Sequence, residues 1–403
     1  MSAFLSLPIA GPVIALAFIA PGLFLLLHAG NKTLLRRVSG RMLTGFGVLL
    51  MMGALTFLLN QRSALSGFSE APGTLVDIGG YKIHVLCEGP RDDEPTDLWI
   101  SGGYSQELHL YHLHAEARKT RRSCLVDRAG TGWSERGPLP RTTKRTVDEF
   151  EAALRELGED GPFVIIGHSL GAVIGANFAA HYPERVVGLV AVDGTPWALV
   201  NATGHGPEGW CKSPYPTFLV LGSMFGLGQA LPFLNPLNHP DAEALHAPLG
   251  EMWEPLKAIE SQPRSLITAH EGLKESCFGG YDVVKLPGSL GDLPILSIVQ
   301  QAHADEAQTL AEAKLWQRIE GKTAIANWRR TSEAAREEYA NYSTRGATIV
   351  APKDAGHLMT LTEPAFVLAA VDSLRAQVVS EDRRRPSIDD PRPLDGARSA
   401  LPE

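Results

Sequence analysis

The stretch FVIIGHSLG, at positions 163–171, decides the fold of this 403-residue chain. Four apolar residues typical of a buried strand run directly into a Gly-x-Ser-x-Gly pattern, and a segment rich in small residues, typical of a tightly packed helix, follows until Pro183. Glycine at 167 and 171 lets the backbones approach closely where a strand turns into a helix. The pattern therefore predicts that Ser169 sits on a strained turn with its hydroxyl exposed, as a nucleophile requires; the alternative is a chance Gly-Ser-Gly turn.

Short apolar runs resembling strands recur on both sides of this stretch. They are Tyr81–Cys87, Leu98–Ser101, Cys124–Val126, Val186–Val192, Ile295–Val299 and Ala347–Val350. Helical patterns fall between or after several of them, as in 147–157 and 366–378. This alternation is typical of a mostly parallel sheet with helices on both faces, so we expect an α/β, doubly wound domain over residues 70–379.

Two segments break the alternation of strands and helices. Residues 195–293 form a long stretch rich in proline, glycine and tryptophan, which we interpret as a lid insertion over the carboxyl edge of the sheet. Residues 380–403 are charged and rich in proline. Because such a composition cannot bury a core, we expect a disordered tail there.

Residues 1–62 differ in composition from the rest of the chain. The segments 4–27 and 42–59 are apolar and uncharged, and the connector between them holds Lys32, Arg36, Arg37 and Arg41 but no acid. About 20 apolar helical residues cross a bilayer, and basic connectors stay on the cytoplasmic side. We therefore predict two transmembrane helices with an extracytoplasmic catalytic domain. A cleaved signal peptide and two helices buried against the domain are the alternatives.

The bulk composition excludes some classes of protein. The formal net charge of −8 provides no concentrated basic surface, so nucleic acid is not expected as a partner. Four cysteines are too few for a disulfide scaffold, and a hydrophobic content of 44% is ample for one large core.

Three further motifs give the chain a resemblance to the α/β-hydrolase family. DRAGTGWS at 127–134 is similar to the family's loop after the fourth strand, DGTP at 193–196 to the loop after the sixth, and DAGH at 354–357 to the catalytic-histidine loop. The resemblance covers roughly residues 81–378. It implies the chain order nucleophile, acid, histidine, with Ser169 as nucleophile and His357 as general base.

The resemblance places the triad acid just beyond the seventh strand, and that strand is predicted at 295–299. Asp305 is the first choice for the residue that orients the imidazole, although the family often has a Gly-x-x-Asp here and this chain lacks that glycine. Glu306 and Asp193 remain alternatives, and Asp305 could instead cap a helix that begins near Glu306.

The resemblance also implies an oxyanion hole made by two backbone amides. One belongs to Leu170, and the other is expected from Gly103, with Tyr104 as the second choice. Ser101 stands where the family commonly has histidine, a departure that could change how this loop is supported.

The four cysteines fall into two candidate pairs. In the fold that the resemblance implies, the second and fourth strands are antiparallel neighbours, which brings the end of one, at Cys87, to the start of the other, at Cys124. Cys211 and Cys277 both lie in the insertion and could form a second bridge. Buried thiols are the alternative for both pairs.

No metal or organic cofactor is implied by the residues. His109, His112 and His114 cluster near the oxyanion loop, but no cysteine or carboxylate completes a metal site at a recognisable spacing. The expected chemistry is hydrolysis of a small, hydrophobic carboxylic ester through an acyl-Ser169 intermediate. The alternatives are an exopeptidase or amidase with the same triad, and a non-catalytic binding protein on a hydrolase fold.

Overall fold

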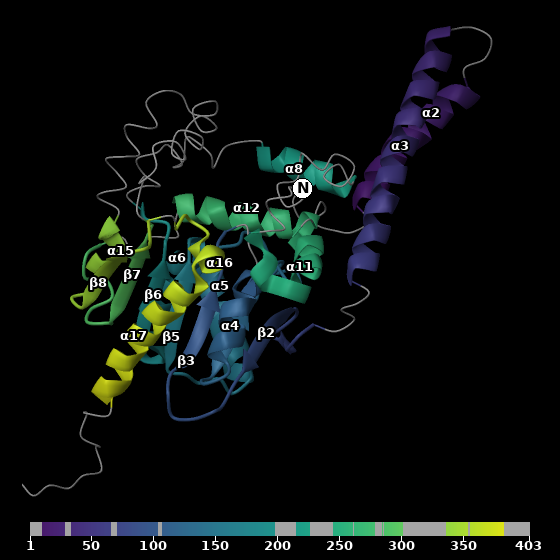
Figure 1. Ribbon diagram of the computed structural model, residues 1–403. Coiled ribbons are helices and arrows are strands. Elements are labelled where there is room, and N and C mark those ends of the chain that lie inside the picture. Colours follow the sequence, from purple (N-terminus) through teal and green to yellow (C-terminus); the bar gives the residue numbers. More distant parts are fainter. Residues whose placement is uncertain are drawn as a thin grey trace, which may run out of the picture.

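The computed structural model describes residues 10–28, 34–65, 71–103, 107–197, 215–225, 245–260, 262–278, 284, 286–300, 336–353 and 355–382. Within them lie a pair of long apolar helices, a sheet with helices on both faces, and a group of helices above the sheet (Figure 1).

The centre of the molecule is an eight-stranded sheet with the order β1-β2-β4-β3-β5-β6-β7-β8. The strands are β1 (Thr74–Asp77), β2 (Lys82–Glu88), β3 (Thr96–Ile100), β4 (Ser123–Val126), β5 (Phe163–His168), β6 (Val186–Val192), β7 (Ile295–Val299) and β8 (Gly346–Val350). β2 pairs antiparallel with both β1 and β4, and the other pairings are parallel. The predicted α/β class with a mostly parallel sheet is confirmed.

The residues of β5 show why both faces of the sheet are covered. Phe163 and Ile165 pack into one core, with α5 (Thr143–Glu156) and α6 (Leu170–His181). Val164 and Ile166 point the other way, into a second core with α4 (Tyr111–Ala117) and α17 (Pro364–Asp382). Successive side chains of a strand face opposite sides, so an apolar strand of this kind needs helices on both.

Shorter helices complete the described part of the domain. They are η1 (Glu107–Leu110), η2 (Pro183–Arg185), α15 (Glu338–Asn341) and α16 (Met359–Thr362). α17 ends at Asp382, and the predicted tail beyond it lies outside the described residues.

The expected insertion between β6 and β7 contributes helices above the sheet. They are α8 (Tyr215–Met224), η6 (Ala247–Met252), α11 (Trp253–Glu260) and α12 (Pro263–Phe278). Figure 1 shows α12 lying across one end of the sheet, with α8 on its far side and α11 beside α3.

The amino-terminal helices α2 (Ala10–Leu27) and α3 (Leu34–Leu65) pack side by side and extend away from the domain (Figure 1). Small residues let their backbones approach. A Cβ at Gly22 would lie 2.7 Å from the Thr44 nitrogen, and one at Gly47 would lie 3.0 Å from the Ala15 carbonyl oxygen. Phe18 and Phe46 meet edge to face with their centroids 5.3 Å apart. We call this pair of helices the hairpin.

A disulfide joins Cys87 of β2 to Cys124 of β4, residues that are directly opposite each other in the antiparallel register. This is the pairing that the resemblance implied. Of the second candidate pair, Cys211 and the side chain of Cys277 lie outside the described residues.

A buried charge cluster ties the last helix to the sheet. The carboxylate of Asp97 on β3 accepts hydrogen bonds from Arg375 of α17 at 2.7 Å and from Arg121 at 2.6 Å, and Arg375 also donates to the carbonyl of Pro95. Asp97 and Arg375 are buried, and burial raises the pKa of Asp97 although both arginines oppose the shift. α17 follows the His357 loop along the chain, so this cluster anchors that loop's far end.

We expect Arg375→Met to lower the free energy of unfolding by about 3 kcal/mol, because it leaves a buried carboxylate with one of its two cations removed. Denaturant unfolding measures the change. Lys144→Met, which removes a partner of the exposed pair with Asp148, should cost less than about 1 kcal/mol. Equal effects of the two substitutions would contradict the anchoring role.

Candidate active site

Ser169 occupies a strained turn between β5 and α6. Its φ of 54° and ψ of −120° lie in a region that side chains rarely adopt. The flanking glycines make this turn possible, because a Cβ at Gly167 would lie 2.5 Å from the Gly171 carbonyl oxygen and one at Gly171 would lie 2.1 Å from the Ile100 carbonyl oxygen. The turn projects Ser169 from the carboxyl end of a central strand, where open α/β sheets place their ligands.

His357 follows β8 and is half-exposed, on the loop before α16. Its Nδ1 lies 2.6 Å from Oδ2 of Asp193, the first residue after β6. The other carboxylate oxygen of Asp193 accepts a hydrogen bond from the Gln300 amide at 3.2 Å, and the Asp193 amide donates to the Ile298 carbonyl at 2.7 Å. Two neighbouring strands therefore hold the carboxylate against the imidazole.

The histidine's partner in the structure is thus the alternative Asp193, and the first choice of sequence reasoning, Asp305, lies outside the described residues together with Glu306. One signal in the sequence favours Asp193. It stands directly at the end of a strand, as Ser169 does, and it is followed by glycine. The backbone at Asp193 has a positive φ of 42°, a conformation that aspartate tolerates better than most residues.

The strained turn at Ser169 and the loop that holds His357 are tied together by His168, the residue before Ser169. Its Nε2–H donates to the carbonyl oxygen of His357 at 2.7 Å, and the two rings lie 4.8 Å apart. Burial, followed by the neighbouring His357, lowers the pKa of His168 to about 3. The His168 ring is therefore neutral at ordinary pH, so no positive charge on it opposes protonation of His357. Sequence reasoning assigned His168 no role.

The Ser169 hydroxyl lies 3.3 Å from the hydroxyl of Thr195, and the Thr195 amide donates to the Ser169 carbonyl at 3.2 Å. Thr195 is part of the 193–196 loop, so a single loop contacts both the serine and, through Asp193, the histidine.

The expected oxyanion donors lie on two segments that meet. Leu170 is the first residue of α6, and the close approach of Gly171 to Ile100 brings this end of the helix against the end of β3. Gly103 follows on that strand's loop, while Tyr104 lies outside the described residues. Arg128 donates to the carbonyl of Gly102 at 2.7 Å. This contact supports the loop in a chain that has Ser101 where the family commonly has histidine.

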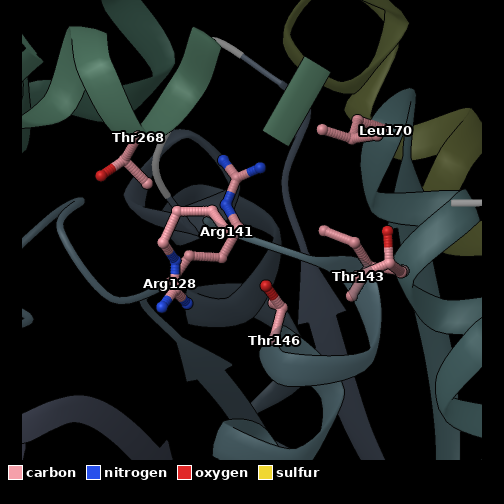
Figure 2. Close-up of a pocket in the computed structure, with 7 residues that line it drawn as sticks. Arg128, Arg141, Thr143, Thr146, Leu170 and Thr268 are labelled. Atoms are coloured by element: carbon pink, nitrogen blue, oxygen red, sulfur yellow. The ribbon is translucent and has the colours of Figure 1, made fainter. Parts of the chain in front are cut away.

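A small pocket with a mixed polar and apolar lining adjoins Leu170. It is lined by Arg128, Arg141, Thr143, Thr146, Leu170, Ile174 and Thr268. Figure 2 shows the two arginines between Thr268, which comes from the overlying helix, and Thr146. Arg141 forms a buried ion pair with both carboxylate oxygens of Glu149, so part of the pocket's positive charge is neutralised.

Two buried acidic residues, Asp127 and Glu107, lie next to Arg128. Asp127 accepts from His84 at 2.8 Å and from the Trp133 amide at 2.9 Å. Burial opposes its ionisation, but His84 and the Trp133 amide lower the pKa of Asp127. Burial raises the pKa of neighbouring Glu107 well above its ordinary value, against the attraction of Arg128.

The clustered histidines bind different protein groups. His109 contacts the Glu260 carboxylate at 2.6 Å, His112 contacts the Thr360 carbonyl at 2.6 Å, and His114 contacts the Ser123 hydroxyl at 2.8 Å. Each ring thus fastens η1 or α4 to another element.

Comparisons with known proteins point to the same fold. Residues 104–210 match the family model for the alpha/beta hydrolase fold. The chain is 28% identical over 137 residues to the uncharacterized protein YbdG of Bacillus subtilis, covering 34% of this chain and 41% of that protein. It is 32% identical over 122 residues to the (Lyso)-N-acylphosphatidylethanolamine lipase of Mus musculus, covering 29% and 35%. The chain thus spans well under half the length of these relatives.

Among solved structures, the enol-lactonase from Burkholderia xenovorans LB400 superposes with a TM-score of 0.52 at 15% identity. The superposition covers 75% of this chain and all of that one. At this level of identity the likeness establishes the fold.

We expect His168→Leu to lower kcat about tenfold with little change in KM, because the His357 loop loses its hydrogen bond to the strained turn. His168→Gln keeps an N–H donor and should retain activity within about threefold. Steady-state kinetics on a soluble ester tests this pair. Equal losses in both variants would indicate that packing of the ring, not the hydrogen bond, matters.

Comparing wild type with His168→Gln also predicts a pH dependence of stability. The unfolded chain protonates His168 near its ordinary pKa of 6.5, whereas the folded chain resists protonation down to about 3. As pH falls through this range, only the unfolded state takes up the proton, so the free energy of unfolding decreases. We expect the stability of wild type relative to His168→Gln to decline from pH 6.5 towards pH 3, as measured by denaturant unfolding.

Proposed function

Because this chain belongs to the α/β-hydrolase fold family, we propose that it is a membrane-anchored serine hydrolase that cleaves carboxylic esters through an acyl-serine intermediate. The observation that carries the proposal is the pairing of His357 with Asp193 beside the strained turn of Ser169. A strained serine and an oriented imidazole have little structural use apart from nucleophilic catalysis.

In the proposed mechanism His357 takes the proton of the Ser169 hydroxyl as its oxygen attacks the ester carbonyl carbon. Asp193 holds the imidazole by its Nδ1–H and stabilises the imidazolium that forms. The amides of Leu170 and Gly103 donate to the developing oxyanion. The alcohol leaves with the proton from His357, and water then cleaves the acyl-serine by the same steps to release the carboxylic acid and restore the serine.

A fluorophosphonate probe should label the wild-type protein and fail to label Ser169→Ala, since it reacts with activated serines. We expect Asp193→Asn to lower kcat at least about a hundredfold, and Asp305→Asn to remain within about threefold of wild type, since a lost orienting carboxylate disables the imidazole. Rates of p-nitrophenyl ester hydrolysis measure both.

Three outcomes would redirect the proposal. Absence of wild-type labelling, or equal labelling of Ser169→Ala, would favour a binding protein on this fold. A large loss confined to Asp305→Asn would return the acid to the loop beyond β7. Faster cleavage of amino-acid amides than of esters would favour an exopeptidase or amidase.

The proposed membrane anchor rests on the surface of the hairpin. Only 22% of the residues of Ala10–Leu27 and 17% of those of the window Arg36–Leu59 are buried, whereas helices in the core of a soluble protein are mostly buried. Large apolar side chains point outward along both helices, among them Leu16, Phe24, Leu27, Met42, Leu49, Met52 and Leu59. A bilayer is the environment in which such a surface is stable.

The proposed orientation puts the basic connector in the cytoplasm and the catalytic domain outside. The disulfide between Cys87 and Cys124 supports it, because disulfides persist in oxidising compartments.

We expect the protein to stay in the membrane fraction during alkaline carbonate extraction. An epitope added after Glu403 should be removed by protease from right-side-out membrane vesicles without permeabilisation. Release by carbonate would contradict the anchor, and protection of the epitope until detergent is added would reverse the orientation.

A further inference from the structure

The hairpin does more than hold the domain near a membrane, because it packs directly on the insertion. A small apolar cluster joins Ala10 of α2, Val220 and Met224 of α8, and Ile267 of α12. These residues are buried. The hairpin helix α2 and the insertion helices α8 and α12 therefore share one small apolar core.

Two glycines bring the backbones of the hairpin and α8 into contact. A Cβ at Gly11 of α2 would lie 2.7 Å from the carbonyl oxygen of Met224, and a Cβ at Gly53 of α3 would lie 2.5 Å from that of Phe225. Such distances are below those of real Cβ contacts, so a side chain at either position forces a shift of backbone against backbone. Small residues at helix contacts of this kind are typical of packing inside membranes.

α12 contacts both this cluster and the pocket next to the proposed active site. Ile267 belongs to the cluster with the hairpin, whereas Thr268, the next residue, lines the pocket beside Leu170. The hydroxyl of Thr268 lies so close to Gly130 that a Cβ there would be 2.1 Å from it. Neighbouring residues of one helix thus contact the cluster shared with the hairpin and the pocket beside Leu170, and Figure 2 shows Thr268 at that pocket.

The side chains between the hairpin and the sheet change from apolar ones on α8 to a partly polar set at the pocket. The sequence of α8, YPTFLVLGSM, contains no charged residue, although the helix lies on the outside of the insertion beside α2 and α3 (Figure 1). On the inner side, arginines and threonines line the pocket together with the apolar Leu170 and Ile174, so polar groups first appear there. A substrate that crossed from the hairpin side to Ser169 would therefore meet apolar groups first and polar groups near its scissile bond.

We propose that the protein takes its substrate from the bilayer itself, past the helices α8 and α12, and that this substrate is a lipid ester with a long acyl chain. The inference rests on the proposed function, since it needs both the serine chemistry and the membrane hairpin. A water-soluble ester has no need of this route, because it can reach Ser169 from solvent.

The test compares two glycines of the same helix. A Cβ at Gly53 collides with α8, whereas a Cβ at Gly45 meets nothing within 4 Å. Gly53→Ala and Gly45→Ala, in the full-length protein reconstituted into vesicles of ether-linked phosphatidylcholine, are assayed with two substrates. One is dioleoylglycerol embedded in the vesicles, and the other is p-nitrophenyl acetate in the surrounding water.

We expect Gly53→Ala to lower the rate on dioleoylglycerol about fivefold or more while the rate on p-nitrophenyl acetate stays within about twofold, and Gly45→Ala to change neither. Gly11→Ala, which disturbs the same contact from α2, should repeat the selective loss and serves if the Gly53 variant does not accumulate.

Equal losses on both substrates, or no loss on the embedded lipid, would overturn the inference. So would a wild-type protein that cleaves p-nitrophenyl acetate but not dioleoylglycerol, and in that case the serine hydrolase proposal would stand. Failure of the wild type with both esters and with the fluorophosphonate probe would instead remove the proposed function and this inference together.

Discussion

The structure depends on a contact between backbones at the carboxyl end of β5. Gly167 and Gly171 lie so close to their surroundings that neither position has room for a Cβ, and this closeness holds Ser169 in a conformation with positive φ. The strain is stored by the sheet and helix on either side, which bury almost every residue from 163 to 179. A well-packed α/β core is therefore the precondition of the strained serine, since a loosely packed one would let the turn relax.

The charged and polar side chains around Ser169 come from the ends of neighbouring strands. β6 ends at Asp193 and β8 leads to His357, while β5 itself ends with the neutral ring of His168. The Asp193 carboxylate accepts a hydrogen bond from the Gln300 amide, just after β7. His357 is held at two points, at Nδ1 by Asp193 and at its carbonyl oxygen by the ring of His168. Three parallel strands thus bring Ser169, Asp193 and His357 to the same edge of the sheet.

Much of this could be predicted from the sequence, for identifiable reasons. β6 and β7 have the residue bounds expected from their apolar runs, because parallel strands buried on both faces read as continuous hydrophobic stretches. β1 was missed because it is an edge strand with three of its four residues exposed, and the histidine-rich α4 shows no clear apolar period. The partner of His357 was harder to choose, since Asp193 and Asp305 both follow strands and only the position of Asp193 directly at a strand end, before a glycine, favours it in the sequence.

The bridge between Cys87 and Cys124 closes a loop that contains all of β3 and α4. Gly103 lies within that loop, so the cross-link restricts the unfolded chain at the segment that must meet α6. A host that keeps its cytosol reducing would leave both sulfurs as thiols. Protein expressed in such a cytosol would have to fold this edge of the sheet without the disulfide. The architecture therefore favours expression with export to an oxidising compartment.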